Sequence, residues 1–318
     1  MNKICLVICY FGKFPDYFYL WKNSALANNT IDFLIFTDNK IKSEKNIKIV
    51  NCTLESIKKK FEDKLGFEIA LHNPYKMCDF KTSYGFMIED YLTNYDFWGY
   101  CDIDLVFGNI RKFITEKILK DNEVVLNLGH FTLFKNNEKL RKIFMMQGAI
   151  YDYKKVYTSN ENYAFDEMSG LHLILKKNAI NCYKKIPIAD INRRYVSFML
   201  EEGTNYKEQV FYYMNNGIFR DYKINNKIYT DELMYLHFQK RKLEIKISYD
   251  TTSYYICPDG FLEMSVPSDF SLNAYNEKIE RKSKVKYLIS KIREFKQKDL
   301  KAKIIWLKQK IYSNRRKK

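Results

Sequence analysis

The sequence predicts an α/β protein with a Rossmann-like, mostly parallel sheet flanked by helices, followed by a basic amphipathic helical tail. Three observations lead to this prediction. Short apolar runs alternate with segments of helical spacing between residues 4 and 128. One of these apolar runs ends in two carboxylates one residue apart, Asp102 and Asp104. Beyond residue 280, lysine and arginine dominate the chain.

Composition indicates a large packed core in a reduced compartment. Aromatic residues make up 16% of the 318 residues, against only 11 glycines and 5 prolines. The seven cysteines are odd in number and contain no C-x-x-C pair, so buried thiols are expected. Residues 4–10 lack a cleavage site and are expected to form a buried strand rather than a signal peptide. Since no run of eighteen apolar residues occurs, we expect the polypeptide to stay in the cytosol.

Most of the net charge of +16 lies in the tail. Residues 281–318 hold 16 Lys and Arg and two acids, which leaves +2 for residues 1–280. A nearly neutral body offers no track for nucleic acid, so no nucleic-acid partner is expected. Apolar residues of the tail recur at three- and four-residue intervals, as in helices that lie on an anionic membrane surface. A dimerisation helix pair and an RNA-binding segment are the alternatives.

The first 65 residues read as strands alternating with helices, which implies a parallel sheet covered on both faces. Pro15 suits the first turn of the first helix. Thr53 is a good N-cap for the second helix, with Ser56 three residues later. The expected strands lie at 4–10, 31–36 and 47–52, and the expected helices at 14–26 and 54–65.

Ligands bind at the carboxyl ends of the strands in such sheets. Tyr10, Phe11 and Gly12 follow the first strand, and Thr37 and Asp38 follow the second. Together these residues would hold a nucleotide. The aromatic ring would stack on a base, the glycine would allow close approach, and the acid would bind ribose hydroxyls or a base N–H. The alternative is that the rings belong to the core and Asp38 caps a turn.

Asp102 and Asp104 follow a buried strand, and Gly108 lets the backbone turn away. Mg²⁺ and Mn²⁺ take oxygen ligands and are commonly shared between carboxylates and phosphates. The pair therefore predicts a metal site that holds a diphosphate. The alternative is that the two acids solvate a loop. Ahead of this strand, residues 73–93 have helical apolar spacing and should form one helix packed on the sheet.

The segment 97–105 resembles the DXD strand end of glycosyltransferases with the GT-A fold, most of all a bacterial family encoded in capsule and surface-polysaccharide clusters. The resemblance also covers segments 10–12, 31–38, 74–81, 129–133 and 235–240. It implies a GT-A-like domain at 1–245, with a nucleotide-binding half at 1–110 and an acceptor half at 111–245. A C-terminal extension at 246–280 and the membrane-association tail at 281–318 follow.

The resemblance implies roles for the metal ligands. Asp104 would bind the ion directly, and Asp102 would contact the ribose and a metal-bound water, or the ion itself. His237, a late histidine in an apolar strand-like run, would complete the site, since imidazole suits Mn²⁺. Lys240 and Arg241 would face the leaving diphosphate, where positive charge is stabilising.

The helix and the loop around this strand would add further contacts to the nucleotide sugar. The resemblance implies such contacts for Lys76, Asp79 and Lys81, although related families carry arginine near Lys81, which grips phosphate bidentately. Solvated helix charges are the alternative. His130, after an expected strand at 123–128, would hydrogen-bond a sugar hydroxyl, or else it is a structural histidine.

Asp166 and Glu167 form a second acidic group, ahead of a helical pattern at 171–175. They lie either at a helix N-terminus, where acids favour the dipole, or where inverting transferases place the base that deprotonates the acceptor. We favour Asp166 for a contact with acceptor or donor sugar. Residues 190–221 are expected to be irregular and to face the acceptor.

These inferences predict a metal-dependent glycosyltransferase with Mn²⁺ or Mg²⁺ as cofactor. The donor would be a nucleotide-diphosphate sugar, with UDP favoured, and the acceptor a hydroxyl of a lipid-linked or growing surface polysaccharide. We expect a cytoplasmic protein attached to the inner face of a bacterial inner membrane. A metal-dependent phosphotransferase or nuclease, and a non-catalytic scaffold of a polysaccharide assembly, are the alternatives.

Overall fold

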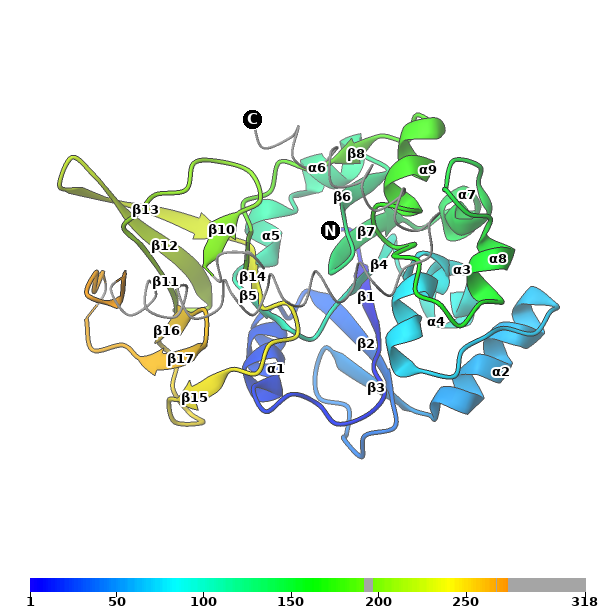
Figure 1. Ribbon diagram of the computed structural model, residues 1–318, viewed down its shortest axis with the longest axis horizontal. Coiled ribbons are helices and arrows are strands. Elements are labelled where there is room, and N and C mark those ends of the chain that lie inside the picture. Colours follow the sequence, from blue (N-terminus) through cyan, green and yellow to red (C-terminus); the bar gives the residue numbers. More distant parts are fainter. Residues whose placement is uncertain (192–196, 267, 274–318) are drawn as a thin grey trace, which may run out of the picture.

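The computed structural model describes residues 1–191, 197–266 and 268–273. The tail at 281–318, with its expected membrane helix, lies outside the described residues. The described chain is a mixed α/β protein, in which a helix-covered sheet stands beside a lobe of mostly antiparallel strands (Figure 1). Within these residues, no helix is both long and apolar enough to cross a bilayer.

A seven-stranded sheet forms the centre of the molecule. Its first four strands are parallel, as expected, but β7 is antiparallel to both of its neighbours, so the sheet is mixed. In spatial order the strands are β3 (Ile47–Asn51), β2 (Ile31–Thr37), β1 (Ile4–Cys9), β4 (Phe97–Cys101), β7 (Phe131–Lys135), β6 (Val124–Leu128) and β8 (Cys182–Tyr183).

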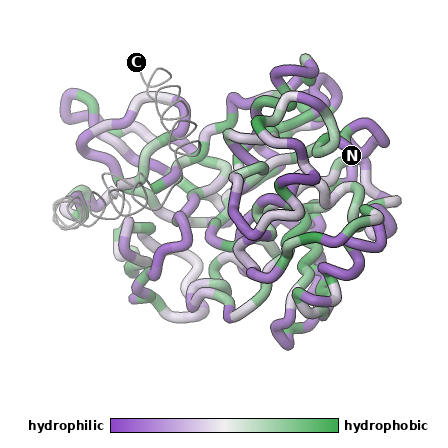
Figure 2. The backbone as a smooth tube through the Cα atoms, turned by 45° about the vertical axis from the view of Figure 1, so that its right-hand side comes forward, coloured by the Kyte–Doolittle hydropathy of each residue, from purple (hydrophilic) through white to green (hydrophobic). Residues whose placement is uncertain are grey.

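Both faces of this sheet are buried, which explains why its strands are apolar at nearly every position. Alternate residues of β1 belong to different hydrophobic cores, one on each face of the sheet: Val7 lies in one core, and Leu6 lies in the second. Figure 2 shows the apolar segments running through the interior, with polar loops outside. The core of Leu6 includes α1 (Phe18–Ala27), α5 (Ile110–Phe113) and α6 (Glu116–Asp121). The core of Val7 includes α2 (Leu54–Leu65), α7 (Glu138–Arg141), η2 (Ile143–Met145), α8 (Tyr153–Tyr157) and α9 (Leu171–Lys177).

The helices follow the expected order but differ in detail. α2 is confirmed together with its capping box, in which Thr53 and Ser56 each accept a hydrogen bond from the other's backbone N–H. α1 begins at Phe18, so the expected start at residue 14 was wrong. Pro15 precedes the helix, and its carbonyl accepts a hydrogen bond from the N–H of Phe18 (2.9 Å).

The single helix expected at 73–93 is also wrong. The chain instead forms a 3₁₀ helix, η1 (Pro74–Ser83), and two single turns, α3 (Tyr84–Met87) and α4 (Glu89–Leu92). A 3₁₀ helix aligns residues three apart, and this brings Lys76 and Asp79 together on its buried side. The apolar helical spacing of residues 73–93 therefore indicated a helical segment but not its type or its breaks.

A four-stranded sheet connects the centre to the lobe. Its order is β10 (Phe198–Leu200), β9 (Ala189–Ile191), β14 (Tyr235–His237) and β5 (Leu105–Phe107). The chain leaves β4, passes through residues 102–104 and enters β5 in this second sheet. Gly108 serves close approach rather than the expected turn, since a Cβ there would lie 2.7 Å from the Leu233 carbonyl oxygen.

The lobe is a six-stranded sheet. Its order is β13 (Lys227–Leu233), β12 (Gly217–Ile224), β11 (Gln209–Met214), β16 (Tyr254–Cys257), β17 (Gly260–Glu263) and β15 (Glu244–Lys246). The irregular segment expected at 190–221 was therefore wrong over the end of β9, over β10 and β11, and over the start of β12. Asn215 and Asn216, with φ of 51° and 61°, make the tight turn between these two strands. Because β16 pairs with β11, the sheet extends across the boundary predicted at residue 245.

Candidate functional site

The predicted metal ligands meet where the central sheet gives way to the second sheet. Asp102 and Asp104 lie between β4 and β5, and β14 runs antiparallel to β5 with His237 opposite Leu105. This pairing brings His237 Nε2 to 3.4 Å from Asp104 Oδ2. The Phe238 N–H donates to the Asp104 carbonyl (2.9 Å), which fixes the end of β14 against the acid.

The three side chains fit a divalent cation. One ligand atom each of Asp102, Asp104 and His237 lies within 4.8 Å of the others. Asp104 is 2% exposed, and its Oδ1 has no hydrogen-bond partner among the described residues. A buried carboxylate oxygen without a partner is costly, and a cation would satisfy it. Two carboxylates and an imidazole suit Mn²⁺ or another borderline divalent ion.

Charge coupling dominates the two buried ligands. Burial alone would raise the pKa of Asp104, but the charge and hydrogen bond of His237 and the nearby Lys240 lower it below its usual range. Burial alone would lower the pKa of His237, but Asp104 and Asp190 raise it above its usual range. The carboxylate form of Asp104 is therefore favoured, with His237 held beside it.

Lys81 is the centre of a buried charge cluster behind the site. Its Nζ lies 2.6 Å from Asp102 Oδ1 and 3.3 Å from Asp166 Oδ2, and it donates to the Gly129 carbonyl (2.6 Å). Burial alone would lower the pKa of Lys81, but Asp102 and its other neighbours raise it well above the usual range. Burial raises the pKa of Asp166 to about 8, although Lys81 opposes this shift. One ammonium thus contacts two carboxyl groups, and the pKa of Asp166 is raised in spite of this contact.

His130 stacks on His237 instead of reaching the open cleft. The ring centroids are 4.0 Å apart with an interplanar angle of 24°. Burial and the charge of His237 hold the pKa of His130 well below its usual range, so its ring is neutral. The His130 carbonyl accepts a hydrogen bond from the Asp102 N–H (3.0 Å), which ties this turn to the metal ligands.

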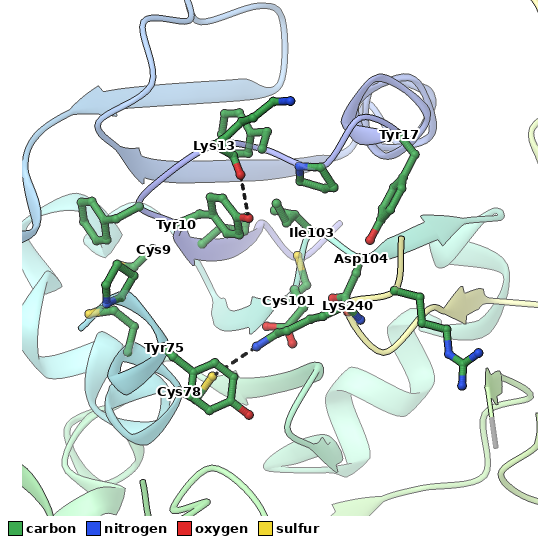
Figure 3. A pocket seen from close by; sticks show the side chains of 18 of the residues that line it. Cys9, Tyr10, Lys13, Tyr17, Tyr75, Cys78, Cys101, Ile103, Asp104 and Lys240 are labelled. Carbon is green, nitrogen blue, oxygen red and sulfur yellow. Dashed lines mark hydrogen bonds between the residues drawn. The ribbon is translucent and has the colours of Figure 1, made fainter. Parts of the chain in front are cut away.

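Asp102 and Asp104 line a cleft of about 1030 Å³. Figure 3 shows this cleft with Asp104 labelled. Tyr17, Tyr75 and Cys78 also line it, and sequence reasoning missed all three. Lys240 Nζ lies 4.4 Å from the Tyr75 ring centroid and 3.7 Å from Cys78 Sγ, over the mouth of the cleft. The predicted site residues that line this cleft are Tyr10, Phe11, Lys81, Asp102, Asp104, Lys240 and Arg241.

A tight turn places Lys240 at the cleft. Gln239 and Lys240 have φ of 56° and 55°, and the Arg241 N–H donates to the Phe238 carbonyl (3.3 Å). This left-handed backbone is unfavourable for residues other than glycine and asparagine. The turn persists because it is anchored: the Lys240 N–H donates to Asp104 Oδ2.

Lys76 and Asp79 face the interior and do not line the cleft. They pair with each other (2.8 Å), and both are almost fully buried. Asp79 also accepts hydrogen bonds from the N–H groups of Tyr163 and Phe165. In this structure the pair therefore supports the loop that carries Asp166, in place of the expected direct contact with a nucleotide sugar.

The remaining predicted residues lie beside the cleft. Asp38 is exposed and accepts a hydrogen bond from the N–H of Gly12 (2.9 Å), which joins the loops after β1 and β2. Gly12 has a φ of +93°, a conformation that favours glycine. Thr37 is buried and accepts a hydrogen bond from Asn39. Glu167 is exposed and lies against Gly129.

Asp190 contacts His237, one of the predicted metal ligands, and sequence reasoning missed it. It lies on β9, paired with His237 of β14, and its Oδ1 is 3.1 Å from His237 Nδ1. Neither the three-residue strand nor its flanking residues mark this role in the sequence. Only the pairing of β9 with β14 brings the two side chains together.

Fold and site together define a mixed α/β protein with a candidate metal centre at the floor of a cleft. Residues 6–265 match the model of a family described as a family of unknown function (DUF6625), and the chain belongs to that family. The matched range runs from within β1 to just beyond β17. Comparison with curated proteins finds no match.

Proposed function

We propose that this protein is a metal-dependent glycosyltransferase of GT-A-like fold that uses a nucleotide-diphosphate sugar as donor. The observation that supports this most is the meeting of Asp102 and Asp104, which line the cleft, with the buried His237 beside them. The two acids and the histidine come from elements more than 130 residues apart in the chain, and Asp104 keeps one oxygen without a hydrogen-bond partner among the described residues. Such an arrangement suits a cation shared with a diphosphate.

The cleft offers complementary groups for such a donor. Tyr10 and Phe11 line it at the carboxyl end of β1, where ligands of parallel sheets bind. Tyr10 is half-buried and stacks on Phe14 (centroids 5.1 Å apart), so a nucleobase at its cleft side would extend this stack. Lys240 and Arg241 supply positive charge at the opposite wall, where the diphosphate would lie.

Asp102, Asp104 and His237 would hold Mn²⁺ or Mg²⁺, which, when bound, offsets negative charge on the leaving diphosphate. Lys240 would add a second positive charge there. Lys81 keeps Asp102 oriented by its 2.6 Å contact. Asp166, with a pKa of about 8, is better suited to proton transfer than the exposed Glu167, but it lies behind Lys81 and does not line the cleft.

The proposal extends to the acceptor and to the location of the enzyme. Three parts of it remain predictions from the sequence. These are a UDP-linked donor, a lipid-linked or growing surface polysaccharide as acceptor, and attachment of residues 281–318 to the cytoplasmic face of the inner membrane. The basic tail supports this assignment because 16 of its 38 residues are Lys or Arg.

Calorimetric titration of the full chain with UDP, GDP and CDP, with and without Mn²⁺, tests the proposal. We expect one diphosphate to bind in a Mn²⁺-dependent manner, and Asp104→Ala to abolish this binding. Asp221→Asn is the matched control, because Asp221 is an equally buried acid that accepts hydrogen bonds from Tyr212 and Thr230 in the lobe. Equal binding by wild type and Asp104→Ala, or none of any diphosphate, would refute the donor site.

A further inference from the structure

His237 lies between two carboxylates, one on each ring nitrogen. Nε2 is 3.4 Å from Asp104 Oδ2, and Nδ1 is 3.1 Å from Asp190 Oδ1. All three side chains are at most 15% exposed. Only the Asp104 side of the ring belongs to the predicted metal group, so the Asp190 contact needs its own explanation.

Asp190 is itself held in place. Its Oδ2 accepts a hydrogen bond from Gln239 Nε2 (2.5 Å). Gln239 belongs to the same turn as Lys240, whose N–H donates to Asp104. One turn therefore fixes a carboxylate on each side of the imidazole. Asp190 Oδ1 has no hydrogen-bond partner within the described part of the chain, and its 3.1 Å approach to His237 Nδ1 is an ion-pair contact.

A second ion site is the competing explanation for Asp190. His130, Asp190 and His237 also bring ligand atoms within 4.8 Å of one another. However, the two imidazoles stack with centroids 4.0 Å apart and planes at 24°. An imidazole nitrogen binds a metal in the plane of its ring, and an ion in the plane of one stacked ring lies far from the plane of the other. The stacking thus disfavours a shared ion and leaves the contact with His237 as the role of Asp190.

We propose that Asp190 is a positioning residue that orients His237 with Nε2 toward Asp104 and so sets the affinity of the metal centre. This inference rests on the proposed metal centre. A carboxylate that accepts the Nδ1–H of a metal-binding histidine fixes its tautomer and ring orientation, so that Nε2 presents its lone pair to the ion. Asp190 does not line the cleft, and it acts only through His237.

Manganese binding by the full chain tests this role without any need for turnover. Free Mn²⁺ is followed by electron paramagnetic resonance during titration of wild type, Asp190→Asn, Asp190→Ala and the buried-acid control Asp221→Asn. We expect Mn²⁺ affinity to fall about 10- to 100-fold in the Asp190 variants, and more in Asp190→Ala than in Asp190→Asn, because the amide can still accept the Nδ1–H. Asp221→Asn should bind like the wild type.

A spectroscopic readout separates positioning from general destabilisation. In the wild type, electron spin-echo modulation should report a nitrogen bonded to Mn²⁺; this signal should be absent in His237→Ala and weakened in Asp190→Ala. Thermal unfolding of each variant identifies any that fails to fold. If Asp190→Ala fails, the Mn²⁺ affinity of Asp190→Asn, the isosteric change, tests the role of Asp190. Unchanged affinity and unchanged nitrogen modulation in Asp190→Asn and Asp190→Ala would overturn the inference while leaving the metal centre intact. No Mn²⁺ binding by the wild type would overturn both.

Discussion

Single charged side chains beneath the cleft decide much of its stability and chemistry. Lys81 is 6% exposed and contacts the carboxyl groups of Asp102 and Asp166 and the Gly129 carbonyl. Removing one partner of a buried ion pair leaves an uncompensated charge, which costs far more than the pair contributes. The same reasoning explains why Lys76 and Asp79 are both buried: each satisfies the other.

Lys81→Met should therefore lower the free energy of unfolding by about 3 kcal/mol or more. The double variant Lys81→Met with Asp166→Asn should recover part of this loss, because the second change removes one of the two carboxyl groups left without their ammonium. Urea unfolding followed by circular dichroism measures both. A single variant within about 1 kcal/mol of the wild type would contradict the buried cluster.

The raised pKa of Asp166 predicts a pH dependence of stability. In the unfolded chain an aspartate titrates near 3.9, whereas in the fold the pKa of Asp166 is about 8. Between these values the unfolded state releases the proton first, so the contribution of the protonated carboxyl to stability is present at low pH and is lost as pH rises.

The stability of the wild type relative to Asp166→Asn should accordingly fall between pH 5 and pH 8, since the amide does not titrate. Urea unfolding of both proteins at intervals across this range measures the difference. Parallel curves for the two proteins would show that Asp166 has an ordinary pKa.

At the scale of elements, local signals predicted structure well where burial followed simple periodicity. The cap of α2 is one such case: Thr53 accepts a hydrogen bond from the Ser56 N–H (3.1 Å), as the sequence predicts. Thr53→Ala should cost about 1 kcal/mol of unfolding free energy without changing Mn²⁺ binding. Thr93→Ala, at an exposed threonine, is the control and should cost less than about 0.5 kcal/mol. Equal effects in urea unfolding would refute the cap.

The turn after β14 has a strained backbone conformation at Lys240, whose side chain lines the cleft. Lys240 has a left-handed φ of 55°, which glycine adopts without cost. Lys240→Gly keeps the backbone N–H that donates to Asp104 but loses the ammonium over Tyr75. We expect stability at least equal to that of the wild type and diphosphate binding about tenfold weaker.

The control for Lys240→Gly is Asn226→Gly, a change at another left-handed position, with φ of 62°, in the turn between β12 and β13. It should leave diphosphate binding unchanged in calorimetry. Wild-type affinity in Lys240→Gly would remove Lys240 from the donor site.

Other elements escaped prediction for reasons that local sequence does not carry. Residues 73–93 have helical spacing, but the chain forms a 3₁₀ helix, with Lys76 and Asp79 paired on its buried side, and two short helical turns. The hairpin of β11 and β12 carried an available signal, since Asn215 and Asn216 stand between two apolar runs, and that signal was missed.

At the scale of the whole molecule, the first four strands and the acidic pair Asp102 and Asp104 could be predicted, because both depend on apolar strands and on the residues directly after each strand. His237 was predicted from family resemblance rather than from its surroundings. Asp190 could not be predicted, because its contact depends on the pairing of β9 with β14, 47 residues apart at these positions. The three-sheet arrangement, in which residues 102–104 connect two sheets, likewise depends on long-range pairing.

The metal-dependent donor site is tested most directly by a crystal structure of the full chain soaked with Mn²⁺ and the diphosphate that binds. Data are collected at the manganese absorption edge. We predict one anomalous peak within bonding distance of Asp104 and His237, with density for the diphosphate between that peak and Lys240. A manganese peak elsewhere, or none despite a bound diphosphate, would contradict a metal-dependent donor site at the end of β4.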